Sequence, residues 1–184
     1  PFRLANDIVG KMPDRSGKWF MDELELIAQR HSVRQYKDIA IEEDKRQIIN
    51  DLVAFINSEH ELNIQVLYDE EECFDSAMAH YGKLVGVKNY IALIGKKSSN
   101  LEEKLGYYGV QIVLELQDLG LNTCWVALTH GKSKALINKG EKEACLVSFG
   151  YGQSQGVAHK SKSLKDISNY QDGMPEWYLK GLEC

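Results

Sequence analysis

The segment Arg30-His31-Ser32-Val33-Arg34 has the residue types and the spacing best suited to binding an anion. It follows a helical pattern and enters an alternating one, so Arg30, Ser32 and Arg34 would point to one side of an extended chain. Two guanidinium groups and a hydroxyl on one face suit a planar, polyanionic partner, such as a phosphate together with the carbonyl-rich edge of a flavin. Considered alone, the pentapeptide favours a plainer interpretation, in which basic residues end a helix and the serine lies in a turn.

The sequence lacks the common motifs of nucleotide-binding, hydrolytic and metal-dependent enzymes. It contains no GxxxxGK[ST], no GxGxxG after an apolar run and no GxSxG, which disfavours a P-loop, a Rossmann site and an α/β-hydrolase. The five histidines form no HExxH and the four cysteines form no CxxC, so neither a metal centre nor a thioredoxin-type site is predicted. We therefore assign no catalytic side chain and no metal ligand.

Length and composition indicate an ordinary globular domain. The chain has 184 residues, of which 43% are hydrophobic, and a formal net charge of −5, values that fit one domain with a full apolar core. Its apolar runs, such as 90–94, are too short to cross a bilayer, so no membrane partner is predicted. Because the N-terminal region lacks the apolar core of a secretory signal and the cysteines lack disulfide spacing, we expect a reduced, cytoplasmic protein.

Basic side chains are concentrated in the segment 129–165, which holds seven lysines and two glutamates within an acidic chain. Scattered lysines without arginine and with few aromatic residues are not typical of a nucleic-acid surface, so no nucleic-acid partner is predicted. Two interpretations remain. The plainer one is a solvated face, and the functional one is a local site for a single phosphate group.

Apolar periodicity predicts the elements that must position these residues. Helices are expected at 22–30, 42–57, 71–84, 101–119 and 132–138, with another that starts at Met174 or Pro175. Strands are expected at 63–68, 89–95, 122–128 and 142–151. Because strands and helices alternate at irregular spacing, the pattern favours an α+β fold with a mixed sheet. The helix at 101–119 is apolar nearly all round, which predicts burial at the centre of the fold or in a subunit interface.

The N-terminal residues differ from the rest of the chain. Residues 1–20 carry basic residues and glycines without a sustained apolar period, whereas the pattern from Met21 onward is regular. We therefore interpret residues 1–20 as an N-terminal tail or an expression remnant, and residues 21–184 as the domain.

Several stretches resemble the FMN-dependent nitroreductase family in its "putative nitroreductase" branch. The run RHSVRQY at 30–36, preceded by an amphipathic helix, is similar to the opening motif of that family. LVGVKNYIALIG at 84–95 resembles a strand region, and YYGVQ at 107–111 with LGLNTCW at 119–125 resembles the central helix and the strand after it. ACLVSFGYG at 144–152 with HKSK at 159–162 resembles the last core strand and a basic motif. Their order and spacing carry the resemblance, which extends from Glu23 to Cys184.

The resemblance implies a nitroreductase-like α+β fold, with a mixed, mostly antiparallel sheet flanked by helices and a long central helix, in a homodimer. It also implies an FMN site built from three segments. The basic pentapeptide would hold the phosphate and the pyrimidine edge of the ring, the backbone after one strand would lie near the isoalloxazine, and the basic motif would close on the phosphate. By number, the expected cofactor-binding residues are Arg30, His31, Ser32, Arg34, Val126, Ala127, Leu128, Lys160 and Lys162.

The function implied by the resemblance is that of an FMN-dependent NAD(P)H oxidoreductase. NADH or NADPH would reduce the flavin, which would then reduce a nitroaromatic, a quinone or a related small acceptor in a ping-pong cycle. Members of the family continue into an A-P-[ST]-x-x-N-x-Q-like segment that gives an asparagine to the flavin, whereas this sequence ends at Cys184. We therefore expect a domain without its C-terminal segment. The alternative function, which that difference slightly favours, is a degenerate flavin-binding protein with an interaction or sensory role.

Overall fold

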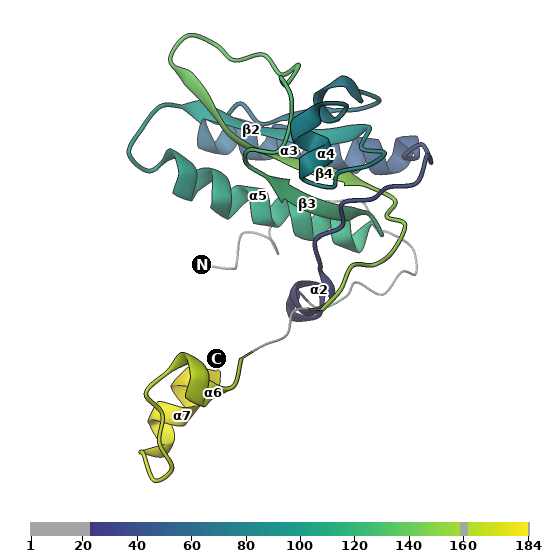
Figure 1. The fold of residues 1–184 in the computed structure, drawn as a ribbon. Coiled ribbons are helices and arrows are strands. Elements are labelled where there is room, and N and C mark those ends of the chain that lie inside the picture. The colour runs from purple at the N-terminus through teal and green to yellow at the C-terminus, as the bar shows by residue number, and fades with distance from the viewer. Residues whose placement is uncertain (1–22, 159–161, 184) are drawn as a thin grey trace.

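The computed structural model, which describes residues 23–158 and 162–183, contains one four-stranded sheet (Figure 1). Its strands are β1 (Gln65–Leu67), β2 (Asn89–Lys96), β3 (Asn122–Val126) and β4 (Glu141–Gly150). They lie in the order β1-β2-β4-β3, and each neighbouring pair is antiparallel. The long strands β2 and β4 therefore form the centre of the sheet, and β3 is the edge strand on the side where residues 32–36 lie.

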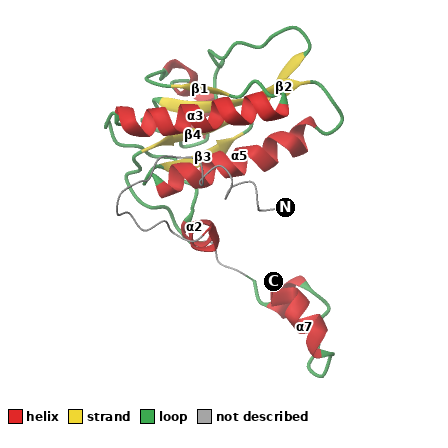
Figure 2. Cartoon of the chain, turned by 180° about the vertical axis from the view of Figure 1, so that it is seen from behind, coloured by secondary structure: helices red, strands yellow, loops and turns green. Residues whose placement is uncertain are grey.

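Helices cover both faces of this sheet. Figure 2 shows α3 (Glu43–His60) and α5 (Leu101–Asp118) side by side across one face. The opposite face carries the short helix α4 (Ala77–Tyr81) and a 3-10 turn, η1 (Glu72–Phe74). The helix α2 (Glu23–Gln29) contacts α5 and leads into the extended segment that starts at Arg30.

The apolar core has two layers because β2 sends alternate side chains to opposite faces. Ile91 and Leu93 pack with residues of α3 and α5, whereas Tyr90 and Ile94 pack with Phe74 and other residues near α4. A strand that is covered on both faces must be apolar at nearly every position, and this explains the uninterrupted run that predicted a buried strand at 89–95.

The nitroreductase-like fold expected from the sequence is confirmed. All pairs of named strands are antiparallel, and the parallel pairing within the described residues consists of isolated bridges from Ser32 to Thr123 and from Gln35 to Val85. The long helix expected at 101–119 is α5, and its Leu105, Ile112 and Leu116 are fully buried.

One predicted helix, 71–84, is divided in two. The 3-10 turn η1 ends at Phe74, and α4 starts only after Ser76, whose hydroxyl accepts a hydrogen bond from the backbone N–H of Ala79 at 3.2 Å. Because Ser76 is a good N-cap in an extended conformation, it starts a new helix and does not continue the previous turn.

A second predicted helix, 132–138, is wrong, because this segment is a loop. Its backbone groups bond to distant side chains: the N–H of Lys134 donates to the Tyr90 hydroxyl at 3.0 Å, and the N–H of Leu136 donates to Gln65 Oε1 at 2.9 Å. These tertiary hydrogen bonds replace the ones that a helix would have made.

The C-terminal part contains α6 (Leu164–Ile167) and α7 (Glu176–Glu183). The start of α7 lies close to the expected Met174 or Pro175, whereas α6 was not predicted, although Ser163 and Asp166 form a capping box there. Both figures show these two helices apart from the sheet. The interpretation of residues 1–20 as a tail concerns a segment outside the described residues.

Within residues 23–158 and 162–183, no helix combines the length and the apolar character needed to cross a lipid bilayer.

Two glycines of α5 allow a matched test of how closely this helix lies against the sheet. A Cβ on Gly109 would lie 2.6 Å from Trp125 Cη2, whereas a Cβ on Gly106 would have no atom within 4 Å. We expect Gly109→Ala to lower the free energy of unfolding by about 1–3 kcal/mol through overpacking. Gly106→Ala should raise it by about 0.5–1 kcal/mol, since alanine is the better helix former. Urea unfolding measures both, and equal effects of the two substitutions would contradict the close packing.

Candidate functional site

The extended segment after α2 is fixed to two parts of the fold by backbone hydrogen bonds. The N–H of Val33 donates to the carbonyl of Thr123 in β3 at 3.0 Å. The N–H of Val85 donates to the carbonyl of Arg34 at 2.9 Å, and the N–H of Tyr36 donates back to Val85 at 3.0 Å. The segment therefore lies between the edge strand and the chain that follows α4.

A third contact comes from the chain that follows β4. The N–H of Gln153 donates to the carbonyl of Gln35 at 2.8 Å, and the N–H of Lys37 donates to the carbonyl of Tyr151 at 2.7 Å. Residues from four distant parts of the sequence thus meet here. The geometry of the segment is consequently set by main-chain contacts and not by its own turn preference.

Tyr36 anchors the end of the segment in the core. Its side chain is buried, and its hydroxyl lies 3.0 Å from Ser148 Oγ and 3.2 Å from the Ser148 carbonyl, to which it can donate. Burial raises the pKa of the Tyr36 phenol, so the side chain stays neutral. Val33 and Tyr36 are buried, whereas Arg34 and Gln35 are exposed. The alternation of buried and exposed side chains therefore ends after Arg34.

A groove of about 370 Å³ lies along this segment. That volume falls within the range of small-molecule sites. Its wall contains two cationic side chains, no acidic side chain, and several hydroxyl, amide and small groups. The lining residues are Ser32, Val33, Arg34, Gln35, Lys83, Ser154, Gly156 and Val157.

The side chains of Arg30, Ser32 and Arg34 lie close enough to the buried thiol of Cys124 to affect its pKa. Desolvation raises the pKa of Cys124, while the charge of Arg34, a hydrogen bond with the Ser32 side chain and the charge of Arg30 act in the opposite direction. The structure therefore gathers these three side chains beside β3. The Nη1 atom of Arg30 is buried and makes no hydrogen bond within the described part of the chain.

Gly156 closes the groove against the expected site residue His31. It has a φ of +84°, and a Cβ at this position would lie 2.6 Å from His31 Cβ. A side chain here would therefore be strained and would also collide with His31, so the groove wall requires glycine. His31 itself is half-buried.

Of the expected site residues that the structure describes, only Ser32 and Arg34 line the groove, and Arg30 and His31 lie next to it in the chain without lining it. Val126 is buried at the end of β3, and Ala127 and Leu128 follow it as exposed residues. Their neighbour Thr129 packs against Gly82, next to the groove residue Lys83. Lys162 is exposed and does not line the groove, and Lys160 lies outside the described residues. The role of all of these residues in binding a cofactor stays a prediction.

Lys83 is a groove residue that the sequence analysis missed. It follows the end of α4 with a φ of +58°, and its backbone N–H donates to His80 at 2.9 Å. The predicted helix at 71–84 would have made Lys83 an ordinary surface residue. The only signal in the sequence was Gly82, which ends the helix one residue earlier.

The described residues contain no cluster of histidine, cysteine, aspartate or glutamate that could hold a metal ion. A helix-covered antiparallel sheet, with a groove at one edge that is lined by two cationic and no acidic side chains, places the protein in the α+β class.

Comparison with known proteins identifies the family. A family model described as "Putative TM nitroreductase" matches residues 22–184. The chain belongs to this nitroreductase family, as the motifs from RHSVRQY onward indicated.

Solved structures of nitroreductases have the same fold. An FMN-dependent nitroreductase from Clostridium difficile R20291 superimposes with a TM-score of 0.60 at 17% identity, over 82% of this chain and 99% of that one. A nitroreductase-like family protein from Bacillus cereus gives 0.55 at 16% identity, over 86% and 100%. A protein from Exiguobacterium sibiricum 255-15, described as a "putative nitroreductase in complex with FMN", gives 0.58 at 13% identity, over 85% and 100%. A search of curated proteins finds no match.

Cys73 and Cys124 are buried and Cys145 is half-buried, which predicts that their thiols are unreactive. Desolvation raises the pKa of Cys73 to about 12 and that of Cys145 to about 11, and it also raises that of Cys124. Because the thiolate is the reactive form, these thiols should resist a disulfide reagent at pH 8 in a folded Cys184→Ser variant and should all react in urea. Rapid labelling of Cys124 in the folded protein would contradict the burial of its thiol.

Proposed function

We propose that this protein binds FMN in the groove along residues 32–35. On this basis it is an oxidoreductase that takes electrons from NADH or NADPH and reduces nitroaromatic, quinone or related small acceptors. The observation that carries the proposal is the buried Nη1 of Arg30, which has no hydrogen-bond acceptor within the described residues. An unsatisfied buried donor on a charged group is costly, and a bound phosphate would supply the missing acceptor.

The groove fits such a ligand in charge and in composition. Arg34 and Lys83 line it, no acidic residue does, and Ser32 adds a hydroxyl. The chain as a whole is acidic, with a net charge of −5. A groove wall with two cationic side chains and no carboxylate therefore has a charge opposite in sign to that of the whole chain. Several convergent donors and no competing anion are what a phosphate and a carbonyl-rich ring edge require.

Each side chain then has a defined task. Arg30 and Ser32 would hold the phosphate, with Lys160 and Lys162 as further expected ligands. Arg34 and Lys83 would hold the polar edge of the ring and stabilise negative charge that develops there. FMN, when bound, supplies the chemistry of accepting a hydride and passing electrons on.

The backbone at Val126–Leu128 and the residue His31 would complete the site. A main-chain N–H after β3 directed at the ring would tune its electronics, and His31 would form the wall against Gly156. No side chain is required as a general acid or base. The chain's own contribution is therefore to bind, orient and stabilise charge.

We also propose a homodimer. The outward faces of α2 and α5 expose apolar side chains, namely Leu24, Ile27, Tyr107 and Val110, and these two helices contact each other. Exposed apolar residues on adjoining helices are typical of a protein–protein interface. A second copy of the chain would cover them.

Substitution of Arg30 tests the phosphate contact. We expect Arg30→Ala to weaken FMN binding about 10- to 100-fold, since hydrogen bonds to charged groups contribute about 1.5–3 kcal/mol each. Arg30→Lys should recover only part of the loss, because lysine keeps the charge without the planar fork. Quenching of flavin fluorescence measures the dissociation constant, and Lys37→Ala, which removes an exposed lysine outside the groove lining, is the control. Unchanged affinity in a folded Arg30→Ala variant would contradict the assignment.

Steady-state turnover tests the activity itself. The FMN-loaded protein should oxidise NADH or NADPH in the presence of p-benzoquinone, with the parallel reciprocal plots of a ping-pong cycle. Protein that binds FMN but oxidises neither nucleotide with any acceptor would refute the enzyme proposal. That result would support the alternative, a flavin-binding protein with an interaction or sensory role.

A further inference from the structure

Four lysines of the basic segment lie away from the groove and are not used by the proposed function. Lys132, Lys134 and Lys139 belong to the connection between β3 and β4, and Lys142 lies at the start of β4. Figures 1 and 2 show this connection extending past the sheet on the side away from α2. The backbone N–H of Lys97 donates to the carbonyl of Gly140 at 3.0 Å, which brings a further lysine to the same loop.

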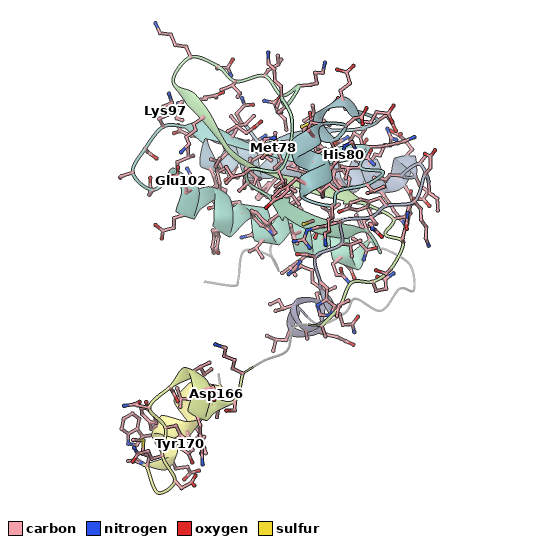
Figure 3. All side chains as sticks on the ribbon, viewed as in Figure 1. Met78, His80, Lys97, Glu102, Asp166 and Tyr170 are labelled. Carbon is pink, nitrogen blue, oxygen red and sulfur yellow. The ribbon has the colours of Figure 1, made fainter. Side chains whose placement is uncertain are left out.

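Three of these five lysines form no ion pair with a described residue. Lys134 pairs with Glu72 and Lys142 pairs with Glu102, each at 2.6 Å. Lys97, Lys132 and Lys139 form no ion pair within the described part of the chain. Figure 3 shows Lys97 and Glu102 at the end of the molecule where the loop leads into β4. Lys97, Lys132 and Lys139 therefore contribute positive charge to this loop, which Glu141 offsets in part, since it accepts a hydrogen bond from the backbone N–H of Asn138 at 2.8 Å.

The same loop exposes two adjacent aliphatic side chains. Leu136 is 76% exposed and Ile137 is 50% exposed. They lie between Lys132 and Lys139 in the chain. A solvated lysine face needs no aliphatic residues at its centre, so charge alone does not explain this arrangement.

The backbone of Leu136 is held in place by two side chains near the start of β1, Asn63 and Gln65. Gln65 donates from Nε2 to the Leu136 carbonyl at 2.7 Å and accepts from its N–H at 2.9 Å. Asn63 Nδ2 also donates to that carbonyl, at 3.2 Å, and to Glu141 Oε2 at 2.8 Å. The loop is thus ordered in the free chain with Leu136 facing solvent, and little entropy would be lost when it contacts a partner.

We propose that the loop 131–140, together with Lys97, is a docking surface for an anionic lipid bilayer. Leu136 and Ile137 enter the interfacial region, and Lys97, Lys132 and Lys139 contact lipid phosphates. A few aliphatic side chains with flanking lysines are the pattern of peripheral membrane contact. The loop has no arginine and no aromatic residue, which a nucleic-acid surface would use. This inference does not depend on the proposed flavin chemistry.

Vesicle sedimentation with the full chain tests the proposal. We expect the protein to sediment with vesicles of phosphatidylcholine and phosphatidylglycerol in equal parts, not with phosphatidylcholine alone, and to be released by salt. Lys132→Ala with Lys139→Ala should weaken binding about 25-fold, since each lysine near an anionic surface contributes about a fivefold factor. Leu136→Ser with Ile137→Ser should weaken it at least about tenfold.

Matched controls distinguish binding through this loop from non-specific adsorption of the protein to vesicles. Ile167→Ser removes an aliphatic side chain that is 61% exposed on α6, and Lys37→Ala removes an exposed lysine elsewhere. Both should bind within about twofold of the parent. Gln65→Ala keeps every residue of the loop but removes two of the three hydrogen bonds that hold the Leu136 backbone, so it should weaken binding several-fold.

Thermal unfolding confirms that each variant is folded. Absence of binding to the mixed vesicles would overturn the proposal, as would equal binding to neutral vesicles. Binding that the loop substitutions leave unchanged would also overturn it. If the protein instead binds an acidic polypeptide through Lys132 and Lys139 and not the vesicles, the surface is a protein-docking site and the lipid assignment is wrong.

Discussion

The arrangement of the site depends on the main-chain pairing of residues 33–37. This short segment bonds to Thr123 in β3, to Val85 after α4, and to Tyr151 and Gln153 after β4. Since the partners are backbone groups from three separate parts of the chain, the conformation of the segment depends on β3, on the chain after α4 and on the chain after β4 being in place. Its side chains then have fixed positions, which is the condition for binding an anion without a large ordering cost.

Charge is distributed in a way that the net value of −5 conceals. The groove wall carries Arg34 and Lys83 without a carboxylate, and Arg30 keeps a buried donor unsatisfied within the described residues. Two of the lysines of the basic segment are neutralised by Glu72 and Glu102 on another face. The phosphate site that we propose is therefore built chiefly by residues 30–34, and most described lysines of the segment 129–165 lie elsewhere.

Local periodicity was sufficient to predict α3, α5 and all four strands, because each buries a face that its own sequence marks. It also placed Arg30, Ser32 and Arg34 on one side of an extended chain. It failed where a partner is distant in sequence. The loop at 132–138 is held by Tyr90 and Gln65, and Lys83 lines the groove only because α4 ends at Tyr81. Val126–Leu128, which the family resemblance assigned to the site, do not line the groove either.

In our proposal the segment 30–34 recognises the phosphate of a flavin. Comparison of FMN with riboflavin by titration calorimetry on the unsubstituted protein tests it most directly, because the two ligands differ only in that phosphate. We expect FMN to bind at least about tenfold more tightly than riboflavin, since charged hydrogen bonds to the phosphate contribute about 1.5–3 kcal/mol each. The difference should shrink in high salt. Equal affinities, or no binding of either flavin, would contradict it.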